Sequence, residues 1–198
     1  DKTLQLIGRR HSVRDFYNAY ELVRKSRIPV VNVDLIIGLP QETEQEIAYS
    51  LEQAVKLVPE NLTVHTLTLK RSAPLFQKQE QAVLTTQAAE KMVQRAAEMA
   101  AAIGLEPYYL YRQHYMLGHL ANIGYAKPGT ESIYNIQMME ERHPVIGVGP
   151  ASASKVPLPD GHHLHKLNMP KNVAVYGARL QELAERRRDL FNIEGTDL

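Results

Sequence analysis

One acidic residue, Asp34, lies in the middle of an apolar run in the segment VNVDLIIGLPQETEQE, residues 31–46. An unpaired carboxylate buried in such a segment would destabilise the fold by several kcal/mol. Asp34 therefore either pairs with a nearby lysine or arginine for structural reasons or faces a cavity that a ligand fills. The strand alone does not favour one of these two interpretations over the other.

Side chains alternate along this strand and separate an apolar face from a partly polar one. The apolar face consists of Val31, Val33, Leu35, Ile37 and Leu39, and the other face of Asn32, Asp34, Ile36 and Gly38. Strands of doubly wound sheets are usually apolar on both faces, whereas a strand that lines a ligand-binding barrel need not be. Parallel α/β proteins bind ligands at the carboxyl ends of such strands, where Gly38 lies.

Two other polar positions flank this strand in the sequence. His65 lies in the next predicted strand, where a lone histidine is more often a hydrogen-bonded core residue than a catalyst. The segment GRRHS, residues 8–12, places Arg9 and two further basic residues, Arg10 and His11, ahead of a predicted helix. Such a cluster could bind a carboxylate or a ribose, although it is more often a solvated loop.

Three further segments contain residue types that bind ligands in some proteins. GVGPAS, residues 147–152, is a glycine-rich turn that matches neither the dinucleotide pattern nor a P-loop. GHHLHK, residues 161–166, has three histidines whose spacing fits no standard metal site, so an exposed loop is expected. PYYLYRQHY, residues 107–115, would suit a flat carboxylated ligand or an ordinary sheet surface.

The composition is that of a globular protein and excludes several classes of function. Of 198 residues, 44% are hydrophobic and 23% charged, and the net charge of +1 gives no reason to expect a nucleic acid partner. No segment approaches the roughly 18 apolar residues of a membrane span. The absence of cysteine excludes disulfides, thiolate nucleophiles and cysteine-ligated metal clusters within the chain and fits a cytoplasmic location. Because the chain does not begin with methionine, we expect a fragment of a longer protein.

The order of the predicted elements indicates a parallel α/β fold. Capping boxes that begin with Ser12 and Thr43 mark two helix starts. The first helix is expected to bury Phe16, Ala19, Tyr20 and Val23. Helices and strands are predicted to alternate over residues 13–27, 28–40, 43–59, 61–69 and 86–103. This alternation is typical of a parallel sheet with crossover helices.

The pattern changes after Gly104. Strands or strand–turns of a mixed, partly antiparallel extension are predicted at residues 106–113, 133–141 and 144–155. A closing helix interrupted by Gly177 is predicted at 171–191. The chain is therefore expected to comprise βα units in residues 1–104 and a C-terminal extension in residues 105–198.

Several of these segments occur together, in the same order and spacing, in a known family. They are IGRRHS, VNVDLIIGLPQET, LTVHTLTLKRSAPL and VIGVGPASAS. Over nearly its whole length, the chain resembles the second half of the oxygen-independent coproporphyrinogen III oxidase family of radical S-adenosylmethionine (SAM) enzymes. PYYLYRQHYMLGHLANIGYAKPG and IYNIQMMEE are similar to its Bacillus-type coproporphyrinogen dehydrogenase branch.

The resemblance implies an α/β fold, the C-terminal part of a partial (β/α)6 radical SAM barrel with a mixed α+β C-terminal extension. In this family SAM lies across the carboxyl ends of the strands. The arginine of GRxH and the aspartate of DLIxGLP contact SAM, and the corresponding residues here are Arg9 and Asp34, with Asp34 at the ribose. Further SAM contacts map near His65, Thr68 and Ala153. Arg9 is expected to lie near Asp34 and to stabilise its charge.

The resemblance also implies an activity and its partners. The whole protein would cleave SAM reductively and decarboxylate coproporphyrinogen III oxidatively to protoporphyrinogen IX in haem biosynthesis, with an electron donor such as flavodoxin or ferredoxin. The family binds a [4Fe–4S] cluster through a CxxxCxxC motif, which this chain lacks. We therefore expect the chain alone to be inactive and its first strand to have an unpaired edge.

Two alternatives stay open beside this one. A haem chaperone or haem-handling paralogue of the same superfamily would bind a tetrapyrrole without oxidising it. A self-contained, cysteine-free α/β ligand-binding domain would be unrelated to the family.

Overall fold

The computed structural model describes residues 1–68, 84–112, 120–158, 160 and 163–192. They form two compact units, Asp1–Ser132 and Ile133–Leu198, and each is described by itself. Part of LTVHTLTLKRSAPL, the end of PYYLYRQHY and one histidine of GHHLHK lie outside the described residues.

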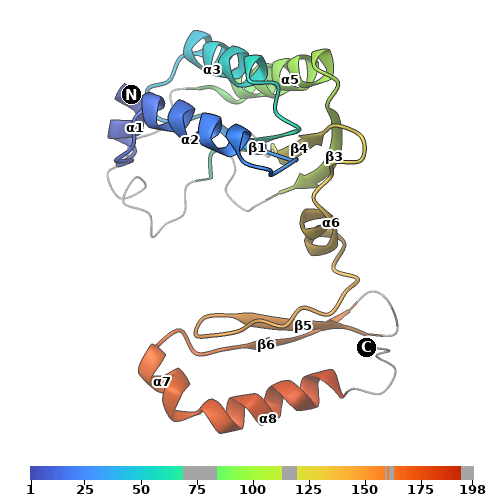
Figure 1. The fold of residues 1–198 in the computed structure, drawn as a ribbon. Coiled ribbons are helices and arrows are strands. Elements are labelled where there is room, and N and C mark those ends of the chain that lie inside the picture. Colours follow the sequence, from blue (N-terminus) through green and yellow to red (C-terminus); the bar gives the residue numbers. More distant parts are fainter. Residues whose placement is uncertain (69–83, 113–119, 159, 161–162, 193–198) are drawn as a thin grey trace. The chain divides into compact units, whose positions relative to one another are not determined.

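The first unit is built on a four-stranded sheet with the strand order β1-β2-β4-β3 (Figure 1). Its strands are β1 (Asn32–Ile37), β2 (Asn61–Thr66), β3 (Glu106–Tyr111) and β4 (Asn122–Ala126). β1 and β2 are parallel, whereas β4 is antiparallel to both β2 and β3. The antiparallel strands belong to the same unit as the parallel pair, so the unit ends well beyond Gly104, where the sequence pattern changes.

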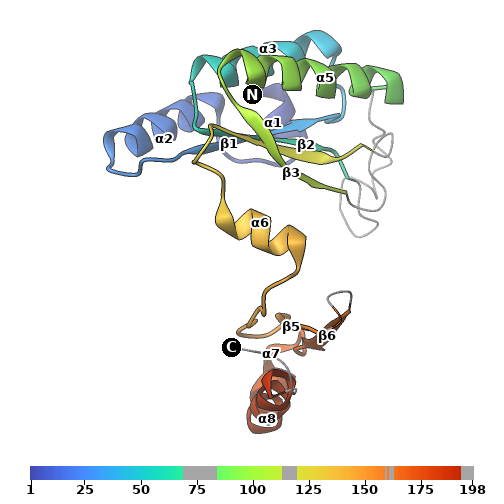
Figure 2. The same ribbon diagram turned by 90° about the vertical axis from the view of Figure 1, so that its right-hand side faces the viewer.

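Helices cover one face of this sheet. The unit contains α1 (Lys2–Leu6), α2 (Val13–Lys25), α3 (Glu44–Lys56) and α5 (Thr86–Ala102). Figure 2 shows α3 and α5 side by side over the sheet. Both predicted capping boxes are confirmed: Ser12 pairs reciprocally with Asp15 at the start of α2, and Thr43 with Glu46 at the start of α3.

The hydrophobic core lies between the sheet and α3 and α5. Leu62 and Val64 of β2 and Leu51 of α3 are buried to 2% exposure or less. The face of α5 that packs here is made of small side chains, since Ala96 and Ala100 are fully buried. Small residues allow the helix backbone to approach the sheet closely, and the core is therefore sensitive to any added volume.

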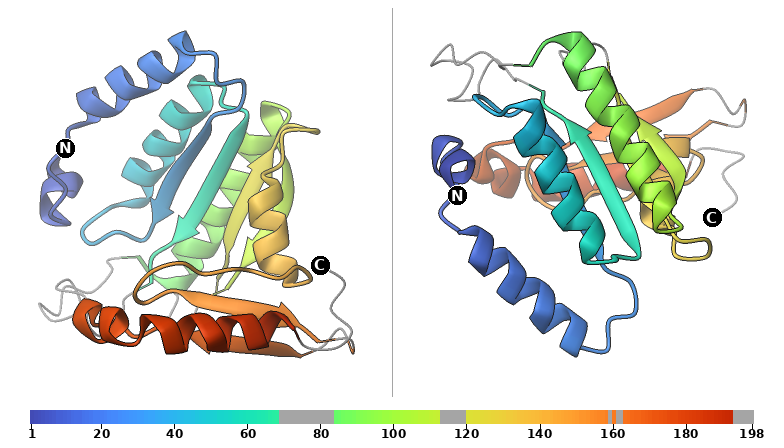
Figure 3. Two further views of the ribbon diagram at one scale, coloured as in Figure 1. Left: turned by 60° about the horizontal axis from the view of Figure 1, so that its bottom comes forward. Right: turned by 90° about the horizontal axis from the view of Figure 1, so that it is seen from above.

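The outer helix α2 buries less than its sequence predicts. Tyr20 is buried and Val23 half-buried, but Phe16 is 38% exposed and Ala19 is exposed. α2 lies on the β1 side of the sheet (Figure 3). β1 pairs with β2 alone among the strands that the structure describes, so the expected unpaired edge is present. A helix beside an edge strand has sheet on one side only, and part of its apolar stripe stays exposed.

In its described residues, the second unit consists of a hairpin and three helices. Its elements are α6 (Ile133–Glu140), β5 (Ala153–Pro157), β6 (Leu164–Asn168), α7 (Val173–Ala178) and α8 (Leu180–Phe191). β5 and β6 are antiparallel. The small core of this unit is formed by Val156, Leu167, Met169, Leu183 and Leu190.

Two predictions for this unit are wrong. Residues 133–141 are predicted as a strand, but Ile133–Glu140 is the helix α6. Ile133 and Tyr134 suggest a strand because one is β-branched and the other aromatic, but their side chains are 70% and 69% exposed. The Gln, Met and Glu residues of the segment favour a helix. The predicted interruption of the closing helix is present, but its predicted position is wrong: Gly177 lies within α7, and the break falls at Arg179, where φ is −113° and ψ 18°.

Candidate functional site

A row of four residues crosses the sheet of the first unit, one from each strand. The register places Asp34 of β1 opposite Thr63 of β2. It places Gly124 of β4 opposite Thr63 on one side and opposite Tyr109 of β3 on the other. Residues directly opposite one another share a face of the sheet. Since Leu62 and Val64 face the helices, this row lies on the face away from α3 and α5.

Hydrogen bonds connect the row to its neighbours in β1 and β2. The Thr63 hydroxyl donates to Asn32 Oδ1 at 3.0 Å, and Asn32 Nδ2 donates to Asp34 Oδ1 at 2.6 Å. His65 Nε2 lies 3.6 Å from the other carboxylate oxygen, Asp34 Oδ2. Asp34 is therefore stabilised by an amide and an imidazole, and among the described residues no lysine or arginine pairs with it.

These groups favour the charged form of Asp34. The His65 imidazole above all, together with the Asn32 amide and the Thr63 hydroxyl, lowers the pKa of the Asp34 carboxyl, against an opposing effect of partial burial. The side chain of Asp34 is nevertheless 59% exposed. An ionised carboxylate accepts several hydrogen bonds, so Asp34 retains the capacity to accept bonds from hydroxyl groups of a ligand.

Among the described residues, no hydrogen bond or ion pair joins Arg9 or Thr68 to this cluster, and the third predicted contact, Ala153, belongs to the second unit. Arg9 is exposed between α1 and α2, and within the described residues no hydrogen bond or ion pair joins its side chain to Asp34. Thr68 follows β2, and its hydroxyl is 3.5 Å from the Thr66 carbonyl oxygen. Ala153 begins β5 of the second unit. Of the predicted contacts in the described part of the first unit, Asp34 and His65 are the pair whose side chains meet.

The remaining candidate segments have structural explanations. In the GVGPAS turn, a Cβ on Gly147 would lie 2.4 Å from the Ala153 carbonyl oxygen, so the chain itself fills the space beside this glycine. In GHHLHK, His163 Nδ1 pairs with Asp160 at 2.6 Å, and His165 is exposed on β6. Across the described part of the chain, no group of three or more His, Asp or Glu side chains could hold a metal ion.

Tyr109 lies in PYYLYRQHY, a segment that the sequence predicts to suit a flat carboxylated ligand or an ordinary sheet surface, and it is not among the predicted SAM contacts. A Cβ built on Gly124 would lie 1.9 Å from Tyr109 Cε1, so the tyrosine ring occupies the space above this glycine. Burial raises the pKa of the Tyr109 phenol, whereas the Thr63 hydroxyl acts in the opposite direction, and the charge of Asp34 raises it slightly further. The signal for this contact is a lone glycine within a strand, which often marks a close approach.

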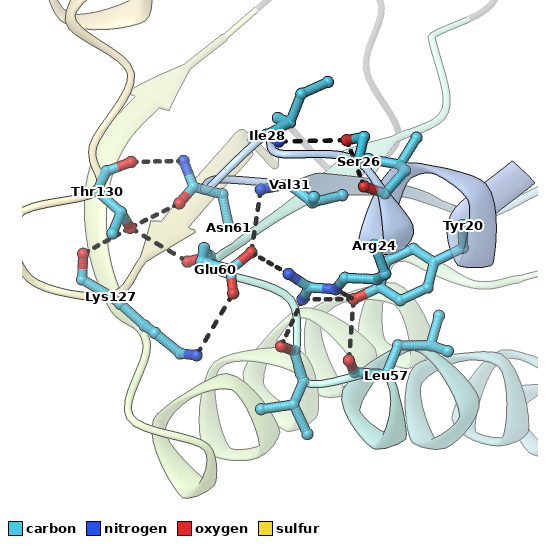
Figure 4. Close-up of polar contacts among 12 residues, drawn as sticks. Tyr20, Arg24, Ser26, Ile28, Val31, Leu57, Glu60, Asn61, Lys127 and Thr130 are labelled. Carbon is cyan, nitrogen blue, oxygen red and sulfur yellow. Dashed lines mark hydrogen bonds and ion pairs between the residues drawn. The ribbon is translucent and has the colours of Figure 1, made fainter.

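A second polar cluster, around Glu60, joins the amino ends of the parallel strands (Figure 4). Glu60 Oε2 accepts from Arg24 Nη1 at 2.7 Å and from the Val31 amide at 3.0 Å, and Lys127 Nζ lies 3.8 Å from Oε1. Burial acts to raise the pKa of Glu60, but the bonds from Arg24 and Val31 outweigh it and lower the pKa. This cluster joins α2, β1, β2 and the end of β4, and its role is structural.

The comparison with curated proteins identifies homologues of the chain. Over 188 residues the chain is 39% identical to the oxygen-independent coproporphyrinogen-III oxidase-like protein HemZ of Bacillus subtilis, a match that covers 94% of this chain and 38% of that protein. The chain is a homologue of the coproporphyrinogen III oxidase-like proteins. Homology extends to the heme chaperone HemW of Escherichia coli, which is 26% identical over 83% of this chain and 40% of its own length. The chain thus spans about two fifths of these relatives.

The fold agrees with that family. The radical SAM enzyme coproporphyrinogen III oxidase (HemN) of Escherichia coli superposes with a TM-score of 0.65 and 16% identity, covering 91% of this chain and 41% of that structure. The expected α/β fold, part of a radical SAM enzyme's fold, is therefore confirmed. No family model matches the chain. A search of the described helices finds none that is long and apolar enough to cross a membrane.

Proposed function

We propose that this chain supplies the ribose-binding part of the SAM site in a radical SAM protein of the coproporphyrinogen III oxidase-like family. The observation that supports this is the ionised, half-exposed carboxylate of Asp34 on the polar face of the sheet. Such a group suits the two adjacent hydroxyls of a ribose, since it accepts hydrogen bonds in a geometry that Asn32 and His65 help to fix.

In this proposal, the roles of the remaining contacts differ. His65 lowers the pKa of Asp34 and lies close enough to meet the same ligand. Arg9 and Thr68 are assigned to the rim of the site through the family resemblance alone, and Ala153 is kept as a SAM contact through that resemblance, without a position relative to Asp34. Bound SAM would supply the hydrogen-abstracting chemistry, and the residues of this chain would bind and orient its nucleoside.

The [4Fe–4S] cluster does not fit this chain, because its ligands are thiolates and the chain has no cysteine. We therefore place the cluster elsewhere in a longer protein and assign no step of it to these residues. The chain alone should be inactive.

The reaction we propose for the whole protein is the oxidative decarboxylation of coproporphyrinogen III, with an electron donor such as flavodoxin or ferredoxin, in the cytoplasm. HemZ, at 39% identity, favours this choice. Haem binding without oxidation is the second candidate, and the similarity to HemW over 83% of the chain favours it.

The SAM proposal is tested by ligand binding to the full-length protein that contains this chain. Adenosine carries the ribose and adenine does not, so the ratio of their Kd values isolates the ribose contact. Asp34→Ala should abolish the preference for adenosine and weaken SAM binding at least tenfold. Glu21→Gln, an exposed acid on α2, is the matched control and should leave both unchanged. Unchanged binding by Asp34→Ala would refute the assignment.

The choice between the two activities needs a separate experiment. The anaerobic full-length protein is incubated with coproporphyrinogen III, SAM and a reductant, and porphyrins are separated by chromatography. Formation of protoporphyrinogen IX supports the oxidase. Stoichiometric haem binding without this product supports the chaperone.

A further inference from the structure

The position of Tyr109 depends on how its strand, β3, pairs with β4. The pairing of β3 with β4 shifts between Pro107 and Tyr109, which leaves Tyr108 as the extra residue of a β-bulge. Bulges re-aim neighbouring side chains and are common beside binding sites. The rings of Tyr108 and Tyr109 meet edge-to-face with centroids 4.9 Å apart, which helps to orient the Tyr109 ring.

Gly124 provides the space that this ring occupies. The three atoms that a Cβ on Gly124 would meet all belong to the Tyr109 ring, at 1.9, 2.3 and 2.9 Å. The φ of Gly124 is not positive, so its backbone conformation does not require glycine. The glycine is needed because the tyrosine ring lies across β4 toward β2.

The direction of the ring brings the phenol toward the middle of the polar row. Neighbouring strands lie about 4.8 Å apart, so a tyrosine lying across β4 reaches the Thr63 side chain on β2. The interactions of the phenol with Thr63 and with the charge of Asp34 agree with this position. A hydroxyl donor and a carboxylate acceptor therefore lie on one face, about one strand spacing apart.

We propose that Tyr109 is a second ligand-binding residue of this site, whose phenol donates a hydrogen bond to the same ribose that Asp34 binds. Asp34 and Tyr109 together would select a ligand with two neighbouring hydroxyls over one without them. The bulge at Tyr108 and the glycine at 124 fix the phenol in this place. This inference rests on the proposed SAM site and extends it to a third strand.

Two substitutions test it by independent means. Tyr109→Phe removes the hydroxyl and keeps the ring, whereas Gly124→Ala keeps the hydroxyl and displaces the ring. Each should weaken adenosine and SAM binding by the full-length protein about fivefold to tenfold, the value of one neutral hydrogen bond, and should leave adenine binding unchanged. Tyr49→Phe, an exposed tyrosine on α3, is the matched control.

A double-mutant cycle separates a direct contact from a general disturbance of the sheet. In a Tyr109→Ala background, Gly124→Ala has no ring to displace and should cause no further loss of adenosine binding. Urea unfolding of each variant shows whether it is folded under the binding conditions. A further loss in the Tyr109→Ala background, with the fold intact, would contradict the proposed mechanism.

The outcomes also separate this inference from the proposed function. If the wild-type protein fails to prefer adenosine over adenine, the ribose site itself is wrong. If the wild type shows the preference and Tyr109→Phe and Gly124→Ala retain it in full, Asp34 binds the ribose without Tyr109 and only the present inference fails.

Discussion

Asp34 and His65 lie on adjacent parallel strands, with 3.6 Å between Asp34 Oδ2 and His65 Nε2. His65 is paired in register with Ile36, so the two side chains meet diagonally across the strands. This distance is too long for a strong hydrogen bond but short enough for a favourable charge interaction when the imidazole is protonated. The contact makes the pKa of Asp34 depend on its neighbour.

His65→Ala should therefore raise the pKa of Asp34 toward its ordinary value of about 3.9, because the imidazole is the largest cause of the lowered pKa. Carboxyl carbon chemical shifts recorded by NMR against pH would measure this change. Asp15, whose pKa is lowered mainly by Ser12, is an internal control and should titrate as in the wild type.

The same pKa has a consequence for stability. A carboxyl whose pKa is lowered by folding stabilises the protein above its unfolded pKa of about 3.9, and this stabilisation is lost as the pH falls through the lower folded pKa. Asp34→Asn should therefore be less stable than the wild type at pH 6, and the difference should shrink toward pH 3. Urea unfolding at several pH values measures it. A difference that does not change with pH would show that the charge of Asp34 is not involved.

Glu60→Gln should destabilise the first unit by about 1–3 kcal/mol. The substitution keeps an acceptor for the Val31 amide but removes the charge that pairs with Arg24, at a side chain that is only 16% exposed. Glu52 pairs with Arg95, and their side chains are 44% and 47% exposed. Glu52→Gln should therefore change the free energy of unfolding by less than about 1 kcal/mol. Equal effects of the two substitutions in urea unfolding would contradict the structural role of Glu60.

Thr43→Ala should cost about 1 kcal/mol in the free energy of unfolding, since it removes the cap of α3. The Thr43 hydroxyl accepts from the Glu46 amide at 3.2 Å, and Glu46 Oε2 accepts from the Thr43 amide at 2.8 Å. Gln45→Ala, an exposed position in the same turn, is the control and should be neutral or slightly stabilising. The difference between the two variants in chemical unfolding measures the cap.

Two adjacent alanines on α5 should differ in how much added volume destabilises the protein. Ala100 is fully buried against the core, whereas Ala101 is exposed. Ala100→Leu should destabilise the protein by about 1–3 kcal/mol through overpacking, and Ala101→Leu should lie within about 0.5 kcal/mol of the wild type. Thermal unfolding of the two variants makes the comparison, and a tolerated Ala100→Leu would mean that α5 packs less closely than described.

Sequence reasoning succeeded where the signals are local. Ser12 with Asp15 and Thr43 with Glu46 are three residues apart, and both capping boxes are present. The apolar face around Val33 also packs as the alternation predicts, because a strand beside helices needs one continuous apolar side. These features depend on a few neighbouring residues and can be predicted without the rest of the chain.

Sequence reasoning failed where distant segments decide the outcome. The strand propensity of Ile133 and Tyr134 gave the wrong prediction, because both are exposed in the helix α6 and contribute little to packing. The contact of Tyr109 with Gly124 depends on a bulge and on the register of two strands. The ion pair of Arg24 with Glu60 joins residues 36 positions apart. No pattern within a short window contains this information.

The Glu60 cluster also bears on the order of events in folding. Its partners are Arg24 of α2, Val31 just before β1, and Lys127 just after β4. Lys127 lies more than sixty residues after Glu60 in the sequence, so this contact closes a long loop. Contacts that close loops of this length form slowly and late. We therefore expect the pairing of Glu60 with Lys127 to form after its contacts with Arg24 and Val31, which close shorter loops.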